Sequence, residues 1–149
     1  MRWLDLPPVW LVAFCVLAWV QASYLPMGLS FGGAWADFAG GLLVGGGVVL
    51  MLLAVAEFRR HKTTVIPHRT ASALIQSGIF TRTRNPIYLG DALVLAGLIL
   101  RFDAVLSLPL LPVFVWVIET RFILKEEDRL RRAFRADFAR YQNKVRRWL

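Results

Sequence analysis

One basic segment between two apolar stretches gathers most of the side chains that could do chemistry. It runs from Phe58 to Gly90, with six Lys or Arg, both histidines and no Asp or Glu. Such a basic loop between membrane spans belongs on the cytoplasmic side. Loops of this length are usually functional or disordered, and hydrophobic residues such as Val65, Ile66 and Phe80 argue against disorder. We therefore predict a folded cytoplasmic site.

Several kinds of site are excluded by the residues available. His61, His68, Cys15 and scattered carboxylates lack the spacing of metal ligands, so no metal is expected. Ser77 and Cys15 have no paired base for nucleophilic catalysis. The chain also has no phosphate-cradling GxGxxG motif, which excludes a soluble Rossmann enzyme. Any cofactor must therefore be held by a different architecture.

Two motifs occur in an order that is more specific than either alone. The first is Arg84-Asn85-Pro86-Ile87-Tyr88-Leu89-Gly90, preceded by the run 74–80 and by His61 at the end of a span. The second begins at Glu126-Glu127 and continues through Leu130, Phe134, Phe138, Tyr141 and Val145 to Trp148. Over roughly the last 90 residues the chain resembles the isoprenylcysteine carboxyl methyltransferase and phospholipid methyltransferase superfamily. The resemblance implies a membrane-embedded enzyme that transfers a methyl group from S-adenosylmethionine to a lipophilic acceptor.

The same resemblance implies which residues form the site. Arg84 would bind the cofactor carboxylate, Tyr88 would lie near the sulfonium, and Glu127 would contact the polar end of the nucleoside. These three are the expected catalytic group. The full predicted cofactor-binding set is His61, Gly78, Arg84, Asn85, Tyr88, Glu126 and Glu127. The expected acceptor contacts are Asp91, Tyr141 and Arg146.

The chain also departs from the family pattern. Phospholipid methyltransferases of the superfamily carry GxG in the span after the first motif, whereas this chain reads Ala96-Gly97-Leu98-Ile99. Asn85 stands where many members have His, and Arg135 and Phe138 stand where Gly and Tyr are frequent. The cofactor prediction stands, while the acceptor stays open between an isoprenylcysteine-like carboxylate and another small hydrophobic, thiol or amine group.

Each site residue also has a simpler explanation. Arg82 and Arg84 would serve as positive charges of a cytoplasmic loop, and Tyr88 would suit an interfacial aromatic belt. Glu126 and Glu127 would pair with arginines one turn on, for only ~0.3 to 0.5 kcal/mol. Asn85-Pro86 would merely start a helix. The occurrence of all these residues in family order favours the site.

The amino-acid composition indicates an integral membrane protein. Of its 149 residues 57% are hydrophobic, mean hydropathy is +0.53, and 16 of the 18 Lys and Arg lie in the central loop and from Arg121 onward. This clustering beside apolar spans favours contact with anionic lipid, and no nucleic-acid recognition motif accompanies the net charge of +8. We expect one domain, residues 1–149, in a bacterial inner membrane, with both termini and the active site cytoplasmic.

Four spans are predicted, at about 8–24, 36–58, 87–100 and 104–121. A cleaved signal peptide is the rival interpretation of 8–24, but one Arg and one Asp make a weak positive flank. The second span carries a GxxxG step from Gly41 to Gly45, which predicts close helix packing. Asp91 lies about one turn inside the third span, where an acid needs a cavity, a partner or a path to the interface.

The C-terminal stretch 124–149 has apolar residues at helical spacing opposite a basic face. It predicts an amphipathic helix that lies on the bilayer, folds over the loop, or does both. The predicted fold is thus all-α: four transmembrane helices, a cytoplasmic loop at 59–86, and a C-terminal helix capping a cofactor pocket. A non-enzymatic transporter subunit or scaffold is the alternative, although a transporter should carry an acid near mid-membrane. An enzyme acting on a soluble acceptor would differ only in its substrate.

Overall fold

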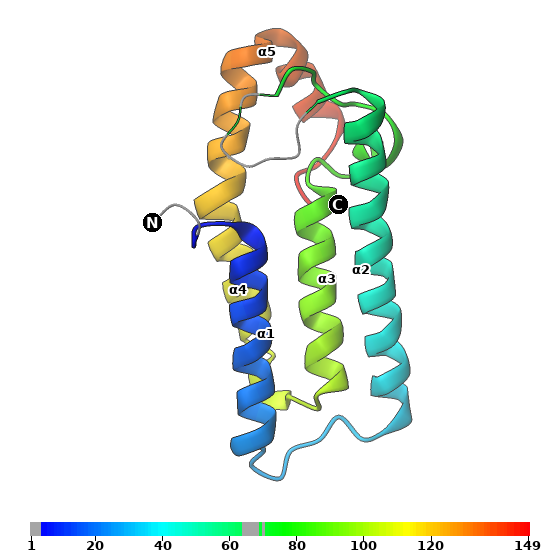
Figure 1. Ribbon diagram of the computed structural model, residues 1–149, viewed down its shortest axis with the longest axis vertical. Helices are drawn as coiled ribbons and strands as arrows, with labels where there is room; N and C mark the ends of the chain where they lie inside the picture. Colours follow the sequence, from blue (N-terminus) through cyan, green and yellow to red (C-terminus); the bar gives the residue numbers. More distant parts are fainter. Residues whose placement is uncertain (1–3, 64–68, 70) are drawn as a thin grey trace.

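The computed structural model describes residues 4–63, 69 and 71–149, and within these ranges every regular element is a helix. Three long helices run side by side along the molecule, and a fourth column of shorter helical pieces packs beside them (Figure 1). Val65, Ile66 and His68 of the predicted loop lie outside the described residues. The all-helical class predicted from the sequence is confirmed for the part of the chain described.

Two of the long helices follow directly from uninterrupted apolar sequence. α1 spans Pro7–Tyr24 and α2 spans Ala34–Arg60. Proline at the start of α1 suits the first turn, where its missing N–H has no intrahelical partner. Both helices are long and apolar enough to cross a membrane, as is the helical stretch Val105–Lys144. The bounds lie within two residues of the predicted spans 8–24 and 36–58.

α3 spans Pro86–Arg101 and lies against α2 along its length (Figure 1). Glycines make this approach possible, because a Cβ built on Gly47 would lie 2.6 Å from the carbonyl oxygen of Gly90. A Cβ on Gly40 would lie 2.6 Å from the carbonyl oxygen of Gly97. We call these two pairs the glycine seam. At 16 residues α3 is shorter than the three helical stretches that are long enough to cross a membrane, so a fourth membrane crossing stays a prediction.

The glycine seam corrects the packing motif expected from the sequence. Gly41 and Gly45, the predicted GxxxG step, are exposed, whereas Gly40 and Gly47 are buried against α3. Gly40 and Gly47 are seven residues apart, about two helical turns, so they share one face of α2. The five glycines of α2 therefore divide into a packed pair and an outward-facing set.

The predicted fourth span 104–121 consists of shorter helical pieces. A 3₁₀ turn at Val105–Ser107 is followed by α4 at Leu110–Ile118 and by the π turn η3 at Glu119–Ile123. Pro109 precedes α4 and Pro112 lies within its first turn, where missing N–H groups break no helical hydrogen bond. The two prolines thus define where this helix begins and do not kink it.

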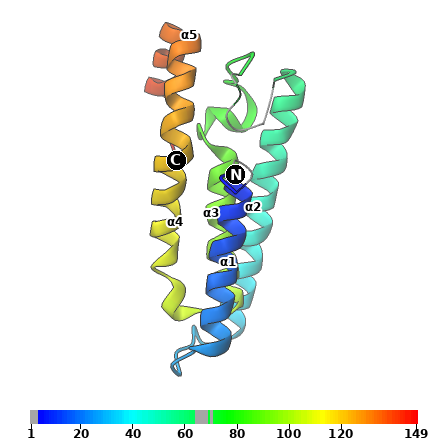
Figure 2. The ribbon, with the colours of Figure 1, turned by 60° about the vertical axis from the view of Figure 1, so that its left-hand side comes forward.

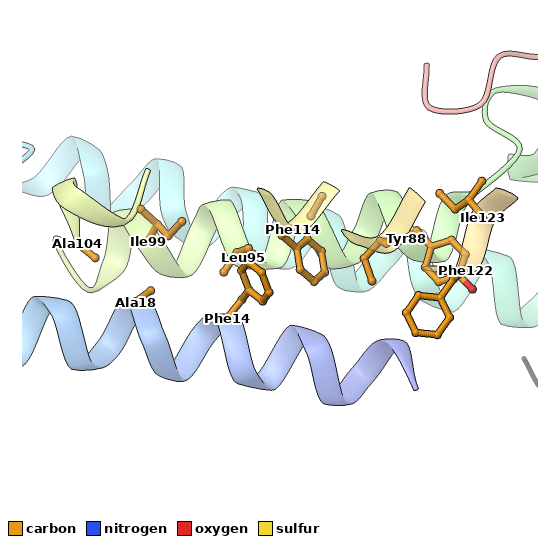
Figure 3. Packing of buried hydrophobic residues seen from close by; sticks show 11 residues of the cluster. Phe14, Ala18, Tyr88, Leu95, Ile99, Ala104, Phe114, Phe122 and Ile123 are labelled. Carbon is orange, nitrogen blue, oxygen red and sulfur yellow. The ribbon is translucent and has the colours of Figure 1, made fainter. Parts of the chain in front are cut away.

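Side chains from three helices form the apolar core. Phe14 of α1 meets Phe114 of α4 edge to face, with ring centroids 5.3 Å apart. Leu95 and Ile99 of α3 are fully buried in the same cluster (Figure 3). Tyr88 and Phe122 continue it toward the end of the bundle that carries the basic residues. The core thereby ties α3, which bears the first motif, to the helical column that bears the second.

The C-terminal helix differs from its prediction. α5, Leu124–Lys144, continues the column of α4 and η3 beyond the ends of the other helices (Figure 2). At Arg135 the backbone has φ 45° and ψ −111°, and the chain turns back. The helix ends at Lys144, so the predicted helix over 124–149 was wrong in its continuity and in its last five residues.

The returning arm of α5 packs over the basic end of the bundle. Phe138, Tyr141 and Val145 are buried there against Ala54 of α2 and Phe80 of the loop. The apolar stripe predicted for this stretch is therefore used for packing within the protein. Of the two roles weighed for this helix, folding over the central loop is the one that the contacts support.

Candidate functional site

A pocket opens between the end of α2, loop residues 69 and 71–85, and the two arms of α5. The space between its lining atoms, open solvent at the mouth included, is about 900 Å³. Its apolar wall includes Phe58, Leu74, Ile75, Phe80, Leu130 and Phe138. Its polar side includes Arg69, Arg84, Asn85, Glu126, Glu127, Arg129 and Tyr141. A ligand with one apolar and one charged end suits this division.

Arg84 is the most conspicuous polar residue of the pocket. Its side chain is 9% exposed, and its Nη1 lies 3.3 Å from Oε1 of Glu127. Within the described residues, neither Nε nor Nη1 of Arg84 has a hydrogen-bond partner. Leaving buried donors of a charged group unsatisfied is costly, and native structures contain few such atoms. The side chain is therefore poised to receive an anionic group.

Glu127 faces Arg84 but is bound mainly by another arginine. Its Oε1 accepts a hydrogen bond of 2.8 Å from Nε of Arg147, and its Oε2 accepts one of 2.9 Å from Nη2. The Glu127 side chain is 8% exposed. The hydrogen bond to Glu127 is the largest cause that raises the pKa of Arg147 above its usual range. Glu127 is thus fixed in orientation before any ligand arrives.

The loop that carries Arg84 is held by the C-terminal tail, residues 145–149. The backbone N–H of Arg84 donates to the carbonyl of Arg146 at 3.1 Å. The carbonyl of Arg147 accepts from Nδ2 of Asn85 at 3.0 Å and from Oγ1 of Thr83 at 3.2 Å. These contacts join segments more than sixty residues apart in the sequence. Figure 1 shows the tail returning to the start of α3.

Glu126 connects the pocket to the core. Its Oε1 accepts a hydrogen bond of 2.6 Å from the Tyr88 hydroxyl. Tyr88 itself is buried in the core cluster, on α3, outside the pocket lining, and this hydrogen bond links it to the pocket. Of the predicted cofactor set, Arg84, Asn85, Glu126 and Glu127 line one pocket and Tyr88 is one hydrogen bond away.

His61 and Gly78 lie apart from that lining, at the end of α2. Ser77 donates a hydrogen bond of 2.6 Å to Oε2 of Glu57, and Nε2 of His61 lies 2.8 Å from the Ser77 hydroxyl. Gly78 has φ 58°, and a Cβ there would lie 2.6 Å from the Glu57 carboxyl group. Only glycine fits this turn, which anchors the loop to α2. Cofactor contact by His61 and Gly78 stays a prediction.

The three predicted acceptor residues are not brought together. Tyr141 lines the pocket and its hydroxyl donates to the Phe80 carbonyl at 2.7 Å. Asp91 is buried on α3, one turn beyond Tyr88. The Arg146 side chain is exposed, and its backbone carbonyl makes the contact to Arg84. Their shared role in acceptor binding is thus a prediction that the geometry leaves to experiment.

Sequence reasoning missed Arg147, Thr83 and Glu119. Arg147 also donates from Nη1 to Oε1 of Glu119 at 2.9 Å, and Nε1 of Trp148 donates to Oε2 at 3.0 Å. Arg147 stands next to Arg146 in a strongly basic tail, so only tertiary contacts distinguish the two. Among the described residues no group of His, Cys, Asp and Glu has the arrangement of a metal site.

Comparison with known proteins identifies the matched region. The family model described as phospholipid methyltransferase matches residues 35–137, more than half of the chain. The match includes α2, the loop with Arg84, and the first arm of α5 with Glu126 and Glu127. No curated protein and no solved structure matches the chain. α1 and the tail that holds Arg84 lie outside the matched residues.

Proposed function

The chain belongs to the phospholipid methyltransferase family, within the superfamily of membrane methyltransferases, and from this premise we propose that it transfers a methyl group from S-adenosylmethionine to a lipophilic acceptor. The family supports methyl transfer in a membrane. The cofactor, the acceptor class and the residue roles are our inference from the pocket.

One observation carries the choice of cofactor. Arg84 lines a pocket that also has apolar and aromatic side chains, and its buried Nε and Nη1 have no hydrogen bond among the described residues. S-adenosylmethionine has a carboxylate at one end and an adenine at the other, so its two ends match the two sides of the pocket. A guanidinium binds a carboxylate through two parallel hydrogen bonds, which suits the free donors of Arg84. The residues present therefore fit the cofactor.

We assign Arg84 to the cofactor carboxylate and the aromatic wall, including Phe58 and Phe80, to the adenine. Glu126 and Glu127 lie on the polar side, where ribose hydroxyls need acceptors; each carboxylate oxygen can accept a second hydrogen bond. Tyr88 would orient Glu126 and lie near the sulfonium. Asn85 occupies the N-cap position of α3, and its side chain ties the loop to the tail by donating to the Arg147 carbonyl.

When bound, the cofactor supplies an electrophilic methyl group on a positively charged sulfur. The protein's own task is positioning, because holding reacting groups about 3 to 3.5 Å apart in line removes much of the barrier. The returning arm of α5, with Phe138 and Tyr141, covers the pocket and excludes water. Asp91, Tyr141 and Arg146 are our candidates for acceptor contact. An amine acceptor would have to be unprotonated, and a buried carboxylate such as Asp91 would serve there.

The proposed orientation places the pocket end in the cytoplasm. Basic residues gather at that end in the loop and α5, whereas the linker between α1 and α2 contains none. The soluble cofactor would then enter from the cytoplasm, while a lipophilic acceptor would enter sideways from the bilayer. The family match leaves the acceptor open between carboxylate, thiol and amine groups on a hydrophobic carrier.

Calorimetric titration with S-adenosylhomocysteine tests this function directly. We expect saturable binding by the wild-type protein and at least about a tenfold loss in Arg84→Ala and Glu127→Ala, since charge-assisted contacts are worth about 1.5 to 3 kcal/mol. Arg82→Ala is the matched control, because Arg82 is exposed and lies outside the pocket lining. Absence of binding by folded wild-type protein, in lipid as well as detergent, would reject the proposal and favour a non-enzymatic scaffold.

A further inference from the structure

Two carboxylates of the α4–η3–α5 column are bridged by one arginine of the tail. Glu119 begins the π turn η3 and Glu127 lies eight residues later in α5. In a regular α-helix a spacing of eight residues leaves two side chains roughly 80° apart around the axis. A π turn takes up one extra residue, which reduces that angle to roughly 20°. The π turn therefore brings both carboxylates to the side that Arg147 faces.

Arg147 uses its whole guanidinium in this bridge. Nε and Nη2 donate to Glu127, and Nη1 donates to Glu119. Its backbone carbonyl meanwhile accepts hydrogen bonds from Thr83 and Asn85 on either side of Arg84. One residue thus fixes the carboxylate opposite Arg84 and also the backbone that carries Arg84.

The bridge also affects which hydrogen bonds Arg84 can form within the protein. Glu127 is the nearest ion-pair partner of Arg84, and a carboxylate and a guanidinium readily form two parallel hydrogen bonds. That arrangement would satisfy Arg84 internally and remove it from the pocket. Arg147 donates to both oxygens of Glu127 and thereby fixes the orientation of that carboxylate. In this orientation Nη1 of Arg84 approaches Oε1 of Glu127 at 3.3 Å as an ion pair, while Nε and Nη1 of Arg84 have no hydrogen bond among the described residues.

We propose that Arg147 is a positioning residue that keeps Glu127 from forming two parallel hydrogen bonds with Arg84 and so leaves Arg84 available for the carboxylate of the cofactor. This inference rests on the proposed function, because it assigns a role within the same pocket. It goes further in making recognition of the amino-acid end of the cofactor depend on the C-terminal tail, which lies outside the family match. Arg147 itself does not line the pocket.

Two ligands separate this role from general stability. S-adenosylhomocysteine has the amino-acid end, whereas 5′-methylthioadenosine has the same nucleoside and lacks that end. We expect wild-type protein to prefer S-adenosylhomocysteine. In Arg147→Ala, Glu127 is free to pair with Arg84, so affinity for S-adenosylhomocysteine should fall about tenfold while affinity for 5′-methylthioadenosine changes less than about threefold. Titration calorimetry measures both affinities.

Three further variants sharpen the test. Arg147→Lys keeps the charge but not the bidentate geometry, so it should show the same loss of preference as Arg147→Ala. Glu119→Gln weakens the bridge from outside the pocket and should lower the preference by a smaller factor in the same direction. Lys144→Ala removes an exposed charge at the end of α5 and should leave the preference unchanged. Thermal midpoints in detergent confirm that each variant is folded.

The outcomes distinguish the two proposals. Binding of neither ligand by wild-type protein would reject the proposed function and the role of Arg147 together. Binding of both ligands, with an unaltered preference in folded Arg147→Ala or Arg147→Lys, would reject the role of Arg147 and leave the function standing. If Arg147→Ala does not fold, Arg147→Lys and Glu119→Gln provide the test. An unaltered preference for S-adenosylhomocysteine over 5′-methylthioadenosine in both variants would overturn the inference.

Discussion

Arg84 and Arg135 each have a feature that costs free energy in the folded protein. Arg84 keeps buried N–H groups without hydrogen bonds among the described residues, an arrangement that costs free energy unless a ligand completes it. Arg135 has φ 45° and ψ −111°, a region that residues with a Cβ rarely occupy. The first cost lies at the pocket, where the proposed ligand would offset it. The second lies at an exposed turn, where it serves only to reverse the chain.

The strain at Arg135 leads to a prediction about stability. Glycine adopts this conformation readily, and the resembling family often has glycine at this position. The Arg135 side chain is exposed, so Arg135→Gly removes strain without removing buried contacts. We expect stabilisation by about 1 kcal/mol, seen as a rise of about 2 to 4 °C in the thermal midpoint in detergent.

Arg131→Gly is the control for Arg135→Gly. Arg131 is equally exposed but lies in the regular first arm of α5, where glycine costs about 1 kcal/mol. The two substitutions should therefore change the thermal midpoint in opposite directions. A fall in the midpoint for both would show that the chain does not reverse at Arg135 with positive φ.

At the scale of elements, the contact between α2 and α3 depends on the glycine seam. The reciprocal close approaches at Gly40–Gly97 and Gly47–Gly90 bring backbone against backbone over two turns. In a membrane, where lipid is as apolar as leucine, such close packing is a main source of helix association. α3 begins directly after Arg84 and Asn85, so the seam also helps to fix these two pocket residues relative to α2.

Adjacent glycines of α2 provide a matched test of the seam. A Cβ on Gly47 would lie 2.6 Å from the Gly90 carbonyl oxygen, whereas a Cβ on Gly46 has no atom within 4 Å in the part of the chain described. Gly47→Ala should destabilise the protein by roughly 1 to 3 kcal/mol because α2 and α3 must separate. Gly46→Ala should be neutral or slightly stabilising. Equal thermal midpoints for the two variants would contradict the seam.

The whole molecule has two unlike ends. One end carries the pocket, the basic loop and α5, and the other carries the linker between α1 and α2 (Figure 1). At the linker end, Asp103 accepts a hydrogen bond of 2.7 Å from the Phe31 backbone, which lowers the pKa of Asp103 below its usual range. The charge asymmetry is the basis for placing the pocket end in the cytoplasm.

Cysteine labelling in spheroplasts tests this orientation. In a Cys15→Ala background, Ser30→Cys reports on the linker and Lys144→Cys reports on the pocket end; both positions are exposed. A membrane-impermeant maleimide should label Ser30→Cys in intact cells and Lys144→Cys only after permeabilisation. The reverse pattern would place the pocket outside the cytoplasm. Labelling of both cysteines in intact cells would mean that the two ends of the molecule do not lie on opposite sides of the membrane.

The sequence by itself determined the helical class, the apolar helices and several of the polar groups at the pocket, although it did not single out Arg69 and Arg129. Long runs of apolar residues leave few alternatives, because a chain in lipid must satisfy its backbone hydrogen bonds within helices. Pro86 marked the start of α3 correctly because the cause is local. Arg84, Asn85, Glu126 and Glu127 were found because two motifs occur in a fixed order.

Only the tertiary structure decided how these groups are related. Periodicity could not show the reversal at Arg135, because the apolar spacing on either side stays compatible with one helix. It could not choose Gly47 over Gly45, since α2 is apolar on all sides and the seam depends on where α3 lies. Arg147 had no local signal either. Its role comes from contacts with Glu119 and Glu127, and with loop residues that lie more than sixty positions earlier in the sequence. Such contacts exist only once the chain has folded.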